Sequence, residues 1–170
     1  MALAGISNSP IRRLVINDVA PTIPSPALSR VTSYLDTRTH FPDLATLETK
    51  LRETLAPFGP MTDADWKRMA ATSSIEVEDG YMLAFDPGIM QNFRNFWLTV
   101  HFNLWRYWEK IECPVLILRG TESDFLPEYL LEKMLRTLPH AELIEFEGVG
   151  HTPTLNAPEQ IEPVARWLSS

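Results

Sequence analysis

Apolar residues in the second half of the chain alternate between two patterns. Residues 115–118 form a short, continuous apolar run and residues 143–146 a mostly apolar one, whereas residues 126–138 and 158–168 carry apolar side chains at helical spacing. An earlier run, residues 14–16, has the β-branched character of a strand that is buried on both faces. The succession strand, helix, strand, helix is typical of an α/β domain built on a parallel sheet. We therefore predict a three-stranded parallel sheet with flanking helices.

The middle of the chain has a different pattern. Prolines at 21, 24 and 26 predict an irregular exit from the sheet layer. Leucines spaced by three and four over 44–55, with Asp43 in position to cap, predict an amphipathic helix. Thr62 is a candidate cap for a second helix, and Pro87 suits the first position of a third. These helices predict a subdomain over 21–111, with 1–20 and 112–170 forming the sheet-containing core.

Aromatic residues are concentrated between 93 and 108. Aromatic side chains dominate buried area wherever they occur, so we interpret this group as the core of a small helical layer. A ligand cage is the alternative. Both interpretations hold together if that layer covers a pocket.

Composition narrows the classes of partner. The 170 residues are 45% hydrophobic, which suits one packed domain. The formal charge is −7 and Lys and Arg are scattered, so we expect no nucleic-acid partner. A lone cysteine, Cys113, cannot form an internal disulfide, and we expect a cytoplasmic location. The apolar start, residues 1–6, is short and lacks a basic leader, so we expect neither a signal peptide nor a membrane span.

Two polar residues follow the last two predicted strands. Asp124 lies six positions beyond Leu118, and His151 lies five beyond Phe146. The carboxyl ends of parallel strands meet at one edge of a sheet, where α/β proteins bind ligands. We therefore predict that Asp124 and His151 are catalytic residues, with the carboxylate orienting an imidazole that acts as a base.

Each of these two residues also has a plain alternative. Asp124 is suited to a turn or to a helix cap, and a lone loop histidine is commonly just solvated. Their joint placement, acid then histidine after successive strands, favours the catalytic interpretation. No metal site is expected, because the four histidines and Cys113 lack ligand-like spacing, and no cofactor is expected.

The chain resembles the C-terminal part of the α/β-hydrolase fold superfamily, in particular its cap-bearing, esterase-like members. The residues that carry this resemblance are grouped in three segments: Arg13-Leu14-Val15-Ile16-Asn17-Asp18-Val19-Ala20-Pro21, Cys113-Pro114-Val115-Leu116-Ile117-Leu118-Arg119-Gly120 with Ser123-Asp124-Phe125-Leu126, and Gly148-Val149-Gly150-His151 with Pro158-Glu159-Gln160-Ile161. The resemblance implies that these are the family's sixth, seventh and eighth strands with their loops. It also implies that 21–111 is a helical cap. Some relatives carry the acid after the sixth strand, which makes Asp18 a rival to Asp124.

The resemblance also implies parts that the printed sequence does not show. We find no counterpart of the first five strands or of the nucleophile elbow Gly-x-Ser-x-Gly. The similar string Gly5-Ile6-Ser7-Asn8-Ser9 precedes a strand rather than following one, so Ser7 is not a candidate nucleophile. Without a nucleophile, the acid and base have nothing to activate. We therefore expect this chain to be inactive on its own.

By resemblance, the parent function is hydrolysis of an ester or related acyl bond in a small-molecule substrate by a Ser-His-Asp mechanism. One alternative is a non-catalytic interaction or structural module derived from a hydrolase. Another is a C–C bond, epoxide or halide hydrolase of the same fold. The first predicted strand would keep an unpaired edge, so we also expect marginal stability and self-association through that edge.

Overall fold

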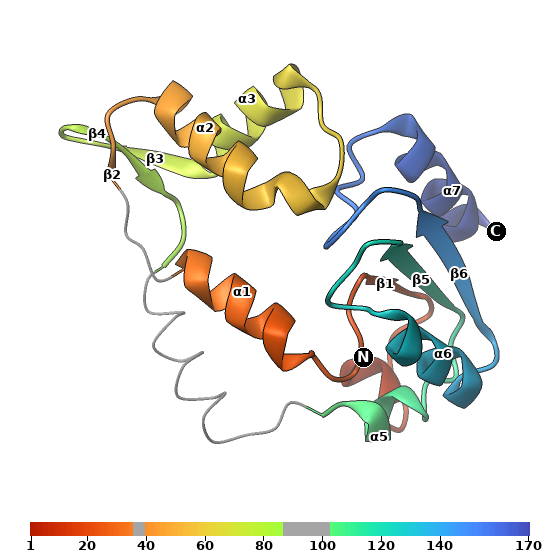
Figure 1. Ribbon diagram of the computed structural model, residues 1–170. Coiled ribbons are helices and arrows are strands. Elements are labelled where there is room, and N and C mark those ends of the chain that lie inside the picture. Colours follow the sequence, from red (N-terminus) through yellow and green to blue (C-terminus); the bar gives the residue numbers. More distant parts are fainter. Residues whose placement is uncertain (36–39, 87–102) are drawn as a thin grey trace. The chain divides into compact units, whose positions relative to one another are not determined.

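The computed structural model describes residues 1–35, 40–86 and 103–170 (Figure 1). It divides the chain into two compact units. The first contains Met1–Ala27, Pro57–Gly59 and Phe102–Ser170, and the second contains Leu28–Ala56 and Pro60–His101. The segments predicted as the core, 1–20 and 112–170, both lie in the first unit. The prediction of a helix starting at Pro87 lies outside the described residues.

The first unit is built on the predicted parallel sheet, ordered β1-β5-β6. Its strands are β1 (Leu14–Asn17), β5 (Val115–Gly120) and β6 (Ala141–Phe146). In this register Ile117 faces both Ile16 and Leu143, so β5 is the central strand. All six residues of β5 are buried, which agrees with the unbroken apolar run at its first four positions, 115–118.

Two helices cover opposite faces of this sheet. Helix α6 (Glu128–Thr137) packs in one cluster with Val115 and Ile117 of β5, and helix α7 (Pro158–Ser169) packs in another with Leu116 and Leu118. Successive residues of a strand point to opposite faces, so the alternate side chains of β5 build two separate cores. This arrangement confirms the predicted α/β architecture.

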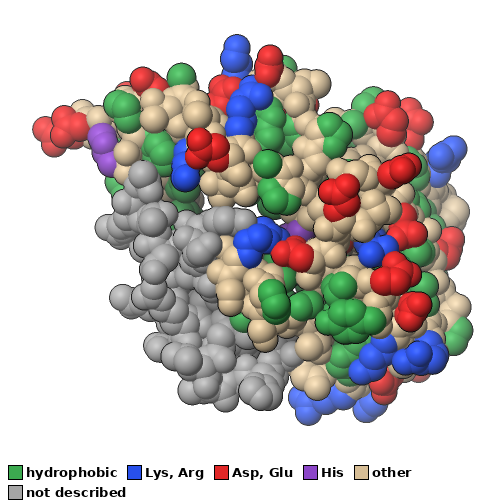
Figure 2. Space-filling view, viewed as in Figure 1, with side chains coloured by type: hydrophobic (Ala, Val, Ile, Leu, Met, Phe, Trp, Pro, Cys, Tyr) green, Lys and Arg blue, Asp and Glu red, His purple; other side chains and the backbone are tan. Residues whose placement is uncertain are grey.

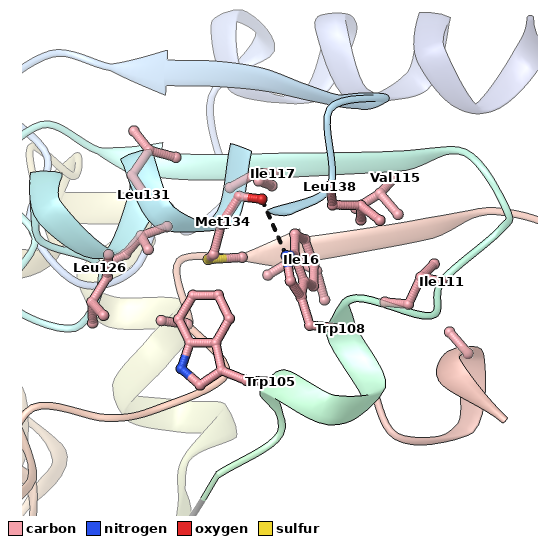
Figure 3. Packing of buried hydrophobic residues seen from close by; sticks show 13 residues of the cluster. Ile16, Trp105, Trp108, Ile111, Val115, Ile117, Leu126, Leu131, Met134 and Leu138 are labelled. Carbon is pink, nitrogen blue, oxygen red and sulfur yellow. Dashed lines mark hydrogen bonds between the residues drawn. The ribbon is translucent and has the colours of Figure 1, made fainter. Parts of the chain in front are cut away.

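The two described tryptophans of the aromatic segment are not where the sequence analysis placed them. Trp105 and Trp108 form the ends of the short helix α5 (Trp105–Trp108), which lies near η1 (Leu3–Gly5). Both are buried in the α6-side core of the sheet, against residues such as Ile16, and Trp108 Nε1 donates to Met134 O at 3.2 Å (Figure 3). For these two residues, the interpretation as the core of a separate helical layer was wrong.

The second unit combines helices with a small sheet. Helix α2 (Leu44–Leu55) has the predicted extent, and α3 (Asp63–Thr72) begins directly after its predicted cap, Thr62; η2 (Ala56–Phe58) follows α2, with Pro57 and Phe58 in the first unit. An antiparallel sheet ordered β2-β4-β3 was not predicted; it consists of β2 (His40–Phe41), β3 (Ser74–Val77) and β4 (Gly80–Leu83). Apolar side chains of α2, α3 and this sheet form its core. The unit is therefore not purely helical.

Helix α1 (Ser25–Leu35) begins inside the proline-rich segment that was predicted to be irregular. Pro26 is its second residue, where a missing amide proton costs no helical hydrogen bond. The prolines therefore mark the start of a helix and not only the end of the sheet layer. No helix in residues 1–35, 40–86 and 103–170 is long and apolar enough to cross a bilayer.

Charged side chains of both signs are mixed on the visible surface. On the face shown in Figure 2, Lys and Arg are interspersed with Asp and Glu. Some of these charges form local pairs within the second unit. Arg52, for example, contacts Glu48 and Asp63, each at 2.7 Å. These pairs are partly or largely exposed, so each contributes little to stability.

Polar side chains cap the first turns of α2 and α3. Asp43 accepts from Thr46 N at 2.7 Å, and Asp65 completes a capping box with Thr62. The backbone hydrogen bond from Thr46 lowers the pKa of Asp43 below its ordinary 3.8. The hydroxyl of Thr62 does the same to the pKa of Asp65. A lowered folded-state pKa means that each cap stabilises the fold above pH 3.8 and loses this effect as the pH falls through the folded pKa.

We predict that the Thr46 amide resonance shifts as Asp43 is protonated below pH 3.8. In Asp43→Asn the amide oxygen keeps the cap but does not titrate, so the Thr46 signal should stay constant over the same range. A pH series of ¹H–¹⁵N spectra measures both. An equal shift in the Asn variant would show that the Asp43 cap is not the titrating group.

Candidate active site

Three loops meet at the carboxyl edge of the parallel sheet. They follow β1, β5 and β6, so their first residues emerge side by side. The loop after β1 supplies Asp18, the loop after β5 supplies Ser123 and Phe125, and the loop after β6 supplies His151. All of these residues belong to the first unit.

Asp18 and His151 form the central contact of this edge. His151 Nδ1 lies 2.8 Å from Asp18 Oδ2. The carboxyl group is fully buried, with 0% side-chain exposure, whereas the imidazole keeps 18%. Because a carboxylate only accepts hydrogen bonds, this contact places the ring proton on Nδ1 and leaves the lone pair on Nε2.

Two further donors converge on Asp18. The amide of Gly120 donates to Oδ1 at 3.2 Å, and the hydroxyl of Ser123 donates to Oδ2 at 2.7 Å. With His151, both carboxyl oxygens therefore accept from groups at the end of β5 or in the loops after β5 and β6. Three donors around one buried group suit a carboxylate, because burial without partners would be costly.

The backbone of Asp18 is held in an unusual conformation. Its φ is +55°, in the left-handed region that few non-glycine residues adopt. Its amide still donates to Leu118 O at 2.8 Å, so the chain stays attached to β5 while it turns. The turn starts one residue past β1, and the side chain of Asp18 consequently lies at the sheet edge.

The loop that carries His151 depends on close backbone approaches. Gly150 N donates to Pro57 O at 2.7 Å, and a Cβ on Gly150 would collide with that carbonyl. Gly148 adopts a φ of +67°. The glycines flanking Val149 therefore allow a sharp bend in this loop.

The acid that contacts His151 differs from the one that the sequence favoured. We predicted Asp124, with Asp18 as its rival, and the structure places Asp18 on His151 Nδ1. Asp124 is exposed and lies four residues past the end of β5, whereas Asp18 follows β1 directly. The strand order explains the outcome, because β1 and β6 flank β5 and their side chains meet across its end.

A hydrogen bond and two ion pairs of Arg119 hold the loop after β5 in place. Arg119 is buried, donates from Nε to Leu126 O at 2.8 Å, and pairs with Glu128 at 2.9 Å and Glu145 at 2.5 Å. The two carboxylates offset the buried positive charge. The described part of the chain contains no group of three or more His, Cys, Asp or Glu residues arranged to hold a metal ion.

We predict that His151 carries its neutral-state proton on Nδ1 because Asp18 accepts it. Asp18→Asn should change this tautomer, since an amide nitrogen that faces Nδ1 donates rather than accepts. Asp124→Asn is the matched control and should leave the tautomer unchanged. Two-bond ¹H–¹⁵N spectra of the histidine rings distinguish the forms. The opposite pattern, with only the Asp124 variant altering His151, would restore Asp124 as the orienting acid.

Comparison with known proteins agrees with this fold. A model of the alpha/beta hydrolase family matches residues 1–164. A 3-hydroxybutyrate-oligomer hydrolase from Cupriavidus necator is 33% identical over 169 residues, which are 95% of this chain and 58% of that protein. The chain thus spans little more than half the length of this relative.

Solved structures give the same result. An alpha/beta hydrolase from Novosphingobium aromaticivorans superposes with a TM-score of 0.85 at 28% identity, covering 98% of this chain and 60% of that one. E-2-(acetamidomethylene)succinate hydrolase superposes with a TM-score of 0.80 at 22% identity, covering 98% of this chain and 61% of that one, and it shows the fold alone. The chain belongs to the alpha/beta hydrolase family.

Proposed function

We propose that Asp18 and His151 are the orienting acid and the general base of a hydrolase that cleaves an ester or related acyl bond. The observation that carries this proposal is the 2.8 Å contact between a fully buried carboxylate and His151 Nδ1 at the carboxyl edge of the sheet. Ligands of α/β proteins bind at this edge. Family membership supports the reaction class.

The roles follow from the hydrogen bonds. Asp18 holds the ring in the tautomer whose Nε2 can take a proton from an attacking hydroxyl group. When Nε2 is protonated, the negative charge of Asp18 stabilises the imidazolium. The contact with Asp18 engages Nδ1, so the proposal assigns the proton transfer to Nε2.

The nucleophile of this proposal is a serine outside the printed sequence. Ser7 is exposed, and its turn precedes β1, whereas an elbow serine lies between a strand and a helix. The 3-hydroxybutyrate-oligomer hydrolase spans a longer sequence than this chain. Its name suggests the substrate class to try first, an ester bond between hydroxy-acid units.

We predict that the chain, extended by the coding sequence that precedes Met1, hydrolyses p-nitrophenyl butyrate and 3-hydroxybutyrate oligomers but not the matched amides. Asp18→Asn should lower kcat about 10⁴-fold, and His151→Ala at least about 10³-fold. Asp124→Asn and His140→Ala, which change exposed residues, are the controls and should keep near wild-type rates. Stopped assays over a substrate series give kcat and KM.

Lack of hydrolysis by the extended protein would contradict this proposal and favour the non-catalytic module. Loss of activity in Asp124→Asn with retention in Asp18→Asn would reverse the assignment of the acid. Turnover by the printed chain alone would contradict the assignment of the nucleophile to a segment outside it.

We also propose that β1 mediates self-association. Leu14 N and Asp18 N donate toward β5, so strand alternation directs the amide of Val15 away from the sheet. Among the described strands, β1 ends the sheet order, and an edge strand is a template for pairing with a second copy.

We predict a concentration-dependent mass in sedimentation equilibrium for the chain and for Val15→Ala. Val15→Pro should shift the equilibrium toward monomer, because proline also removes the outward amide proton. Both variants lose the packing of the Val15 side chain, so their difference isolates the edge hydrogen bond. A monomer at all concentrations, or equal behaviour of the two variants, would contradict pairing through β1.

A further inference from the structure

The hydroxyl of Ser123 has a defined orientation. Its oxygen accepts from the amides of Phe125 at 3.1 Å and Leu126 at 3.0 Å, and it lies 2.7 Å from Asp18 Oδ2. The first two partners are donors, so the single hydroxyl proton must go to Asp18. Ser123 is 7% exposed, which leaves little water to replace this bond.

Phe125 contacts His151, the partner of Asp18. Its ring stacks on the imidazole of His151, with centroids 3.8 Å apart and planes 14° apart. Phe58 meets the same imidazole edge-on, at 6.2 Å and 85°. The hydrogen bond to Asp18 fixes the ring at Nδ1, and the stacked phenyl ring restricts rotation out of that plane.

Ser123, which contacts Asp18, and Phe125, which contacts His151, belong to one short segment whose backbone is held by hydrogen bonds. The Ser123 hydroxyl binds the Phe125 amide, so the position of Phe125 depends on Ser123. One residue further on, Leu126 O accepts from the buried Arg119. Residues 123–126 are therefore held at both ends, so a shift of Ser123 also shifts Phe125.

We propose that Ser123 and Phe125 are positioning residues, with Ser123 orienting the Asp18 carboxylate and Phe125 orienting the His151 ring. This inference rests on the proposed function of Asp18 and His151. The loop after β5 then serves to align an acid and a base that come from the two neighbouring strands. The hydroxyl proton of Ser123 acts on His151 through Asp18, so this part of its effect must disappear when Asp18 cannot accept.

The experiment uses the full printed chain and follows the His151 ring by NMR at one fixed pH. In Ser123→Ala, the Nδ1 proton should exchange with water about tenfold faster than in the unchanged protein, because a charge-assisted bond to Asp18 is lost. Ser123→Thr keeps a hydroxyl and should restore slow exchange. Ser169→Ala removes an exposed hydroxyl from α7 and is the matched control.

The coupling is tested in the Asp18→Asn background. There, Ser123→Ala should change the His151 ring spectra less than it does when Asp18 is present, because only the contact of Ser123 with the Phe125 amide remains to be lost. An equal effect of Ser123→Ala with and without Asp18 would overturn the role of Ser123, as would an unchanged exchange rate in Ser123→Ala alone. If Ser123→Ala does not fold, Ser123→Cys, which has a similar size but a weak donor, provides the same comparison.

The role of Phe125 is tested through the chemical shifts of the His151 ring protons. The carbon-bound protons of His151 lie over the phenyl ring, and the ring current should move their resonances upfield. Phe125→Leu should reverse this shift and speed Nδ1 exchange, whereas Phe125→Tyr should keep both values. Unchanged His151 resonances in the Leu variant would overturn the role of Phe125.

These spectra require no turnover. Failure of ester hydrolysis would therefore contradict the proposed function and leave the positioning result standing. Conversely, normal spectra in the Ser123 and Phe125 variants of an active hydrolase would contradict the positioning inference alone.

Discussion

The hydrogen bond between Asp18 and His151 depends on the parallel arrangement of β1, β5 and β6. Parallel strands end at the same edge, so residues 133 positions apart in the sequence become neighbours. The central strand β5 is short and fully buried, and its loop leaves at Gly120, where a side chain would collide with the β6 loop. This close approach lets the β1 and β6 loops meet. Every contact of the candidate site follows from that geometry.

Much of the fold could be predicted because local patterns and tertiary burial agree. The apolar runs at β1, β5 and β6 and the helical spacing of α6 and α7 each produced the expected element. Asp43 and Thr62 cap as predicted, since a cap is decided within one helical turn. The β2-β4-β3 sheet was missed, although Ile75, Val77, Tyr81 and Leu83 alternate on either side of the turn at Glu78-Asp79.

The candidate site could be predicted only in part. His151 and the sheet edge came from the order of strands, which the sequence shows. Which of Asp18 and Asp124 contacts His151 depends on which carboxylate is buried and on which one accepts from Ser123. Burial and this hydrogen bond are set by the tertiary structure and not by the local sequence. Likewise, the burial of Trp108 against the parallel sheet comes from packing that no periodicity predicts.

The central claim is that Asp18 is the carboxylate that orients His151. A high-resolution crystal structure of the chain measures this most directly, through the distances from His151 Nδ1 to the two candidate acids. We predict Asp18 Oδ2 within hydrogen-bond distance, with the Ser123 hydroxyl on the same oxygen. Asp124 in that position, or an imidazole without a carboxylate partner, would contradict the account.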